Sequence, residues 1–275
     1  MIQKQIRLQD KALFYSVTGA GQPLVLVHGF AEDSDVWREQ VELLAKNHLL
    51  IIPDLPGSGL SGLQPDMHIE SLADHVKYIL DQELPNQNRE NSIIMIGHSM
   101  GGYITLAFAE KYPGMLQAFG LFHSTAFADS EEKKSSRRKS IEFMQTHGSY
   151  EFIKQSVPNL FTEDYRIKNA DTVAAMIERY GSFDRRALIA YYDAMIARPD
   201  RTAVLQSFNK PILFLIGKND KAISFEDSMR QCHIPVLATV EILEASAHMG
   251  MWEEKEKSNR ALLSFLEQVQ QLALH

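Results

Sequence analysis

The chain has a single cysteine, Cys232, among its 275 residues. One thiol excludes a disulfide within the chain and favours a reducing compartment, so we predict a cytoplasmic location. The N-terminal residues show no apolar signal segment, and no run approaches the roughly 18 apolar residues that a membrane-spanning helix needs. We therefore expect no association with a membrane.

The chain also lacks an excess of positive charge. Its 28 Lys and Arg residues stand against 35 Asp and Glu, which gives a formal net charge of −7 and an isoelectric point near 5.8. That acidity argues against a nucleic-acid partner. The His, Asp and Glu residues show no metal-ligand spacing, so we predict no metal site and no other cofactor. The oligomeric state leaves no signature in the sequence.

Short apolar runs alternate with helix-forming stretches over the first 122 residues. Strands are expected at 2–8, 12–17, 24–27, 49–52, 93–96 and 116–122, and helices at 34–46, 69–83 and 103–111. The first two strands should form an antiparallel hairpin at the edge of a sheet. Runs that are apolar throughout are typical of strands covered on both faces. The alternation predicts an α/β fold with a mostly parallel, doubly wound sheet.

The pattern changes after His123. Residues 124–208 show helical periodicity only, at 127–147, 150–157, 170–180, 185–196 and 201–208. Strands return within 211–220 and at 238–243, and a helix is expected at 255–273. We predict a core of residues 1–123 and 209–275 with a helical insertion of 124–208 after the sixth strand. The basic run 133–139 should be a solvated helix face, because Glu131 and Glu132 offset its charge.

The most informative motif is I-I-M-I-G-H-S-M-G-G at 93–102. An apolar strand, a serine flanked by glycines and a helix-forming stretch follow one another, which is the nucleophile-elbow pattern G-x-S-x-G. Ser99 should have a strained backbone that raises its hydroxyl above the sheet. Side chains at Gly97 and Gly101 would collide with the neighbouring strand and helix.

Two further residues complete an acyl-transfer site in the chain order that the elbow requires. Asp220 follows an apolar strand, and His248 follows the strand expected at 238–243. A serine hydroxyl is a weak nucleophile at neutral pH, so it needs a base, and His248 would take the Ser99 proton. Asp220 would hold the other imidazole N–H and stabilise the imidazolium.

Five ordered stretches give the chain a resemblance to the α/β-hydrolase superfamily, in particular to its capped serine esterases and haloperoxidase-like members. They are P-L-V-L-V-H-G-F (23–30), P-D-L-P-G-S-G-L-S (53–61), G-H-S-M-G-G (97–102), L-I-G-K-N-D (215–220) and S-A-H-M (246–249). The resemblance spans nearly the whole chain and implies an α/β-hydrolase fold in which 124–208 forms a helical cap. It also implies that Asp54 shapes a loop and is not the acid. Asp227 is a more distant alternative acid.

Charge that develops on a substrate carbonyl oxygen needs preorganised donors. The backbone N–H of Met100, at the start of a helix, is one candidate. The second should be the backbone N–H of Phe30 in the H-G-F loop, where the resemblance implies that His28 shapes the loop without transferring a proton. The Phe30 side chain, with His98 and His123, is expected to line the substrate pocket.

These residues predict a serine hydrolase that cleaves carboxylic esters of small to medium apolar acyl compounds, with a small-molecule substrate and no cofactor. Thioesterase, lactonase, perhydrolase and carbon–carbon bond hydrolase activities would use the same triad and stay open. Carbon–carbon hydrolases typically have Asn where this chain has His98, which argues against that option. Ser99 excludes the epoxide hydrolases and dehalogenases, whose elbow residue is an aspartate. A ligand-binding protein with vestigial hydrolysis is the alternative from another class, and the intact triad argues against it.

Overall fold

The protein is described by a computed structural model that places residues 1–8, 10–84 and 91–273. Within them, eight strands form one sheet in the order β1-β2-β4-β3-β5-β6-β7-β8. The strands are β1 Ile2–Leu8, β2 Lys11–Thr18, β3 Gln22–Val27, β4 His48–Pro53, β5 Ile93–His98, β6 Leu116–Phe122, β7 Ile212–Gly217 and β8 Ala238–Leu243. β1 and β2 form the predicted antiparallel hairpin at the sheet edge, and every pair from β4 to β8 is parallel. The predicted mostly parallel sheet is confirmed.

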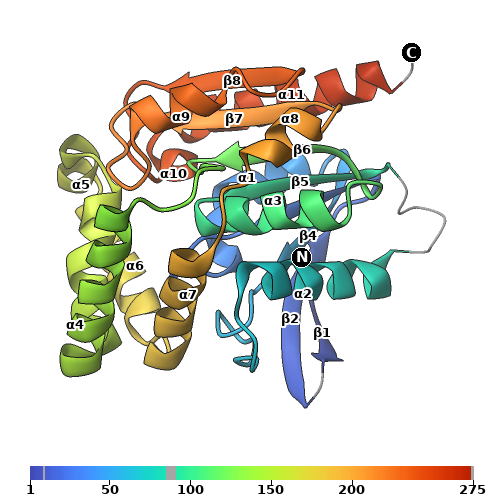
Figure 1. Cartoon of the computed structure of the whole chain (residues 1–275). Coiled ribbons are helices and arrows are strands. Elements are labelled where there is room, and N and C mark those ends of the chain that lie inside the picture. The colour runs from blue at the N-terminus through green and yellow to red at the C-terminus, as the bar shows by residue number, and fades with distance from the viewer. Residues whose placement is uncertain (9, 85–90, 274–275) are drawn as a thin grey trace.

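Helices cover both faces of this sheet (Figure 1). They are η1 Ser34–Trp37, α1 Arg38–Leu44, α2 Ile69–Glu83, α3 Met100–Lys111, α8 Thr202–Ser207, α9 Phe225–Gln231, α10 Gly250–Glu253 and α11 Lys255–Leu272. Side chains alternate across a strand, so Val25 and Val27 of β3 pack in the core that α2 and α3 cover. Leu24 and Leu26 pack in the second core, which α1 and α11 cover. Burial on both faces explains why the central strands are apolar throughout.

Between β6 and β7 the chain leaves the sheet and forms a group of helices beside it (Figure 1). They are α4 Glu131–Ser156, η3 Val157–Leu160, α5 Glu163–Lys168, α6 Ala170–Gly181 and α7 Arg185–Ala197. Gly148 has a φ of 87° and interrupts α4 where the sequence pattern predicts a break between two helices. The helical character of 124–208 matches the prediction, while the role of this segment as a separate cap stays a prediction.

The differences from the predicted elements are local. The helix expected at 34–46 begins as a 3₁₀ turn, which the Asp33 side chain caps by accepting the Asp35 N–H. Helices α5 and α9 are not predicted, since six and seven residues are too few to show periodicity. No helix among the described residues is long and apolar enough to cross a membrane.

Candidate active site

Ser99 lies at the junction of β5 and α3 with a φ of 50° and a ψ of −116°, the strained backbone expected of an elbow. A Cβ at Gly97 would lie 2.3 Å from the carbonyl oxygen of Gly101. A Cβ at Gly101 would lie 2.3 Å from the carbonyl oxygen of Val27. Real Cβ atoms do not approach backbone so closely, so both positions require glycine. The predicted reason for these two glycines is confirmed.

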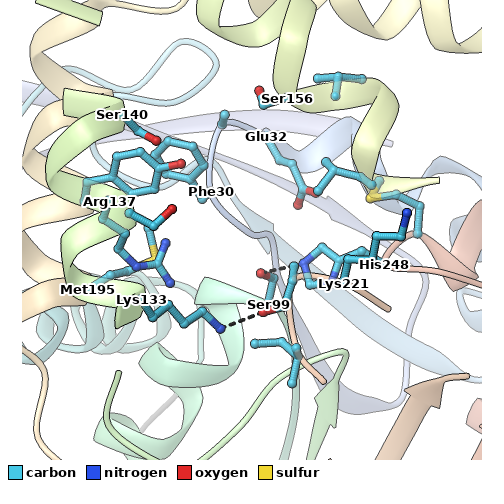
Figure 2. A pocket seen from close by; sticks show the side chains of 18 of the residues that line it. Phe30, Glu32, Ser99, Lys133, Arg137, Ser140, Ser156, Met195, Lys221 and His248 are labelled. Carbon is cyan, nitrogen blue, oxygen red and sulfur yellow. Dashed lines mark hydrogen bonds between the residues drawn. The ribbon is translucent and has the colours of Figure 1, made fainter. Parts of the chain in front are cut away.

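The structure brings together the three residues of the predicted triad, of which Figure 2 shows Ser99 and His248. His248 Nε2 lies 2.8 Å from Ser99 Oγ, and His248 Nδ1 lies 2.7 Å from Asp220 Oδ2. Ser99, Asp220 and His248 follow β5, β7 and β8, so all three stand at the carboxyl edge of the parallel strands. Parallel strands that end at one edge thus place side chains from distant parts of the chain in contact.

The surroundings of Asp220 keep its carboxylate ionised. Burial alone would raise the pKa of Asp220, but the charge of His248 and bonds to the carboxylate outweigh burial and lower that pKa. Asp220 Oδ1 accepts hydrogen bonds from the backbone N–H groups of Ala222, at 2.7 Å, and Ile223, at 3.0 Å. Asp220 Oδ2 is then free to accept the Nδ1–H of His248. The Nε2 lone pair of that tautomer faces the Ser99 hydroxyl.

The two alternative acids have other partners. Asp54 accepts the backbone N–H of Ser34 at 2.9 Å and lies so close to Gly59 that a Cβ there would be 2.3 Å from its carboxylate. It holds the loop after β4 in shape. Asp227, on α9, pairs with Arg230 at 3.0 Å. Asp220 is therefore the carboxylate that contacts His248.

The two predicted oxyanion donors come from two segments, the residue directly after Ser99 and the loop after β3. Met100 is the first residue of α3, where a backbone N–H has no partner within the helix. Phe30 follows β3 and lines the same cavity as Ser99. Among the described residues, neither N–H has a protein acceptor. His28 Nε2 accepts the Leu55 N–H at 3.0 Å, so this ring holds the loop and does not face Ser99.

The prediction that His98 lines the substrate pocket is wrong. Its ring is fully buried, with Nδ1 2.9 Å from Glu32 Oε2 and Nε2 3.0 Å from the carbonyl oxygen of His248. Burial would lower the pKa of His98, but the Glu32 carboxylate outweighs burial and raises it. An acceptor beside each ring nitrogen and the raised pKa both favour the imidazolium form of His98. Glu32 also accepts the Gly29 N–H at 2.7 Å, which connects the Phe30 loop to the backbone of His248.

The prediction that His123 lines the pocket is also wrong. Its ring is buried, and Nδ1 and Nε2 each lie 3.0 Å from a backbone nitrogen, of Gly217 and Gly250 respectively. Burial lowers the pKa of His123 well below its usual value, so the ring is neutral. A Cβ at Gly250 would lie 2.5 Å from His123 Nε2. The ring therefore fills the space between the end of β7 and the start of α10 and has no free edge for a ligand.

A cavity of about 510 Å³ opens in front of Ser99 and His248. One wall is apolar and comes from the end of α4, η3 and α6. Its members are Ile153, Val157, Leu160, Phe161 and Met176. The other wall is polar and comes from the first half of α4 and its N-cap residue. Its members are Ser130, Lys133, Ser136, Arg137 and Ser140.

The polar wall corrects the reading of the basic run 133–139 as a wholly solvated face. Lys133 and Arg137 face the cavity, while Arg138 and Lys139 are exposed. The residues of the polar wall recur at intervals of three and four, which places them on one face of the helix. The sequence signal for this face was its three serines at helical spacing, because small polar side chains leave room for a cavity beside a helix.

Comparison with known proteins agrees with this architecture. Residues 22–145 match the family model described as alpha/beta hydrolase fold. The chain has the α/β-hydrolase fold, and its similarity to proteins of the α/β-hydrolase superfamily extends over nearly its whole length. A solved esterase from Thermogutta terrifontis, with malate bound, is 27% identical with a TM-score of 0.89, and the match covers 98% of this chain and 99% of the esterase.

Curated relatives of this α/β-hydrolase act on several substrates. Lipase 1 of Psychrobacter immobilis is 28% identical over 90% of this chain and 78% of the lipase. An (E)-2-((N-methylformamido)methylene)succinate hydrolase of Acinetobacter baylyi is 23% identical over 97% of this chain and 99% of its own length. The protein is a hydrolase. Its cytoplasmic location and the predicted lack of a nucleic-acid partner stay predictions.

One further residue of this hydrolase escaped the sequence analysis. Glu253 Oε2 accepts the backbone N–H groups of Ala247, at 2.8 Å, and Met249, at 3.3 Å, on either side of His248. Its other oxygen accepts the Thr162 N–H at 2.7 Å. The carboxylate therefore holds the His248 loop against the helical insertion. Its position five residues after His248 was visible in the sequence, but its bonds depend on the fold.

Proposed function

We propose that this hydrolase cleaves carboxylic esters through an acyl-enzyme formed on Ser99. The supporting observation is the position of His248, which lies 2.8 Å from Ser99 Oγ and 2.7 Å from Asp220. His248 Nε2 removes the Ser99 proton as Oγ attacks the carbonyl carbon, and then returns the proton to the departing alcohol. Water, activated by the same imidazole, hydrolyses the acyl-enzyme and regenerates Ser99.

In this proposal the backbone N–H groups of Phe30 and Met100 hold the oxyanion of each tetrahedral intermediate. Both are preorganised, because the Gly29 N–H is fixed by Glu32 and Met100 begins a helix. Donors fixed before the reaction stabilise developing charge without reorganisation.

We propose further that residues 124–208 act as the cap and enclose the acyl part of the substrate. The cavity of about 510 Å³ falls in the range of small-molecule sites. Its apolar wall, from Ile153 to Met176, suits an acyl chain of small to medium length. A pocket that is closed by a separate segment also limits access of water to the acyl-enzyme.

The test is a fluorophosphonate probe together with turnover of p-nitrophenyl acetate and butyrate. We expect covalent labelling at Ser99, and loss of labelling and of most turnover in Ser99→Ala. Ser182→Ala, at an exposed serine, is the matched control and should behave as wild type. Labelling at another serine would refute the assignment of Ser99. A folded protein without labelling or turnover would favour the ligand-binding alternative.

A further inference from the structure

Two cationic side chains face the cavity from successive turns of α4. Lys133 and Arg137 are four residues apart, about 6 Å along the helix axis. Figure 2 shows both extending from this helix into the cavity. Lys133 Nζ donates to the Ala222 carbonyl oxygen at 2.6 Å, and Arg137 Nε donates to Asp129 Oδ2 at 2.6 Å. Each bond uses one donor only, so an ammonium with three N–H groups and a guanidinium with five retain further donors.

The positive charge behind this wall exceeds the negative charge. Asp129 is buried and accepts from both Arg137 and Arg198, the latter at 3.0 Å. One carboxylate thus faces two guanidinium groups, and Lys133 adds a third cation whose partner is a neutral carbonyl. Arg198 is 5% exposed, and its Nε and Nη1 atoms have no partner among the described residues. An uncompensated buried charge is costly unless a ligand pairs with it.

The positive charge changes the pKa of Tyr103, a residue of the cavity lining. It lies one helical turn after Ser99, lines the cavity, and covers the Arg198 guanidinium with its ring at 3.8 Å. Burial alone would raise the pKa of the Tyr103 hydroxyl, but the charges of Arg198, Lys133 and Arg137 outweigh burial and lower it. The charge of the three cations therefore acts on a side chain that lines the cavity.

The acidic groups that line the cavity do not neutralise the wall. Glu32 pairs with His98 at 2.9 Å, and Asp227 pairs with Arg230 at 3.0 Å. Glu132 is exposed, and Lys221 contributes another cation to the lining. The wall therefore stays positive, while the opposite wall is apolar.

We propose that Lys133 and Arg137 bind a carboxylate carried by the ester substrate, whose remaining part lies against the apolar wall. This inference rests on the proposed ester hydrolysis. The fork of a guanidinium and the ammonium beside it suit the two oxygens of a carboxylate. Two kinds of ester fit, a half-ester of a short dicarboxylic acid and an ester whose alcohol bears the acid.

The kinetic test compares two charged esters with one neutral ester. p-Nitrophenyl hydrogen glutarate carries the charge on the acyl side, 4-carboxyphenyl butyrate carries it on the leaving group, and p-nitrophenyl butyrate is neutral. For one charged ester, Lys133→Met and Arg137→Met should each lower kcat/KM relative to the neutral ester by about 10- to 100-fold. Lys134→Met and Arg138→Met, on the same helix but outside the cavity lining, are the matched controls and should leave the ratio unchanged. The charged ester whose kcat/KM falls in these variants shows whether the substrate carries its carboxylate on the acyl group or on the leaving group.

A binding test separates this inference from the proposed function. Glutarate should bind Ser99→Ala in calorimetry and protect the protein against thermal unfolding, and Lys133→Met in the same background should weaken binding about tenfold or more. Glutarate binding without ester turnover would refute the proposed function and retain the anion site. Turnover of the neutral ester with unchanged ratios in both variants, and without glutarate binding, would overturn the anion site and retain the ester hydrolase.

Discussion

The two sides of the cavity are built differently. On the sheet side, Ser99, Asp220 and His248 follow the ends of three strands. At the elbow around Ser99 the backbone segments pack so closely that Gly97 and Gly101 leave no room for a Cβ. On the helical side, the first half of α4, before the break at Gly148, presents Lys133 and Arg137. The backbone is therefore constrained around the proposed nucleophile, whereas on the helical side the side chains determine the surface of the cavity. We therefore expect substitutions on the sheet side to reduce the rate with every ester, and those on the helical side to change which ester is preferred.

The largest effect is expected for Asp220→Asn. The amide removes the charge that stabilises the imidazolium and favours the wrong tautomer of His248, so kcat should fall by up to about 10⁴-fold, as in serine proteases. Asp193→Asn, at an exposed site on α7, is the control and should keep the wild-type rate. The measurement is turnover of p-nitrophenyl butyrate, with circular dichroism to verify folding. A larger loss in a folded Asp54→Asn would show that Asp54 is the acid.

Gly101→Ala should be the most destabilising change at the elbow. Its Cβ would lie 2.3 Å from the Val27 carbonyl oxygen, so β3 and α3 must separate. We expect a loss of about 3 kcal/mol or more in the free energy of unfolding, together with loss of activity. Urea denaturation measures the first and ester turnover the second. Wild-type stability in this variant would contradict the backbone constraint that distinguishes the sheet side.

The buried pair of Glu32 and His98 should make stability depend on pH. The pKa of His98 is raised in the folded protein, so its contribution is complete below about 6.5 and is lost as the pH rises through the raised pKa. The pKa of Glu32 is lowered, so its contribution is complete above about 4.5 and is lost as the pH falls. Glu32→Gln should therefore lower the melting temperature most between about pH 4.5 and 6.5.

Melting curves from pH 4 to 9 test that dependence. Glu42→Gln, on the outer part of α1, is the matched control and should give a nearly constant difference from wild type. A difference for Glu32→Gln that does not change with pH would show that the buried His98 is not charged.

The apolar wall should set a preference among neutral esters. Each buried methylene is worth about 0.8 kcal/mol, close to fourfold in kcat/KM, so the value should rise from acetyl to butyryl or hexanoyl esters and then fall. Met176→Ala should reduce the butyryl-to-acetyl ratio, while Met229→Ala, on the surface of α9, should not. A preference for acetate over every longer ester would contradict the proposal that the apolar wall binds the acyl chain.

The smallest effect is expected for Gly148→Ala. Its φ of 87° disfavours an L side chain, yet a Cβ there has no atom within 4 Å. We expect a cost of about 1 to 2 kcal/mol in the free energy of unfolding and unchanged kcat with p-nitrophenyl acetate. Comparison with Gly101→Ala separates backbone strain from steric collision. A loss of turnover as large as that of Gly101→Ala would remove the distinction between the two sides.

Local patterns were sufficient for several parts of this protein. Strands Ile2–Leu8, Leu116–Phe122 and Ala238–Leu243 and helix Ile69–Glu83 have their predicted bounds. The hydrophobic period that defines such elements is contained in consecutive residues, so it is legible without the fold. The glycines around Ser99 are equally local, because the elbow is one strand-to-helix turn.

The sequence by itself therefore determined the sheet, the elbow and the order in which Ser99, Asp220 and His248 follow their strands. Only the tertiary structure decided the partners of charged side chains. His98 and His123 do not line the predicted pocket, because Glu32, Gly217 and Gly250 contact their ring nitrogens. Arg137 lies on the inner face of its helix because its guanidinium pairs with the buried Asp129. A local pattern records whether a residue carries charge, whereas its environment depends on segments that folding brings from elsewhere in the chain.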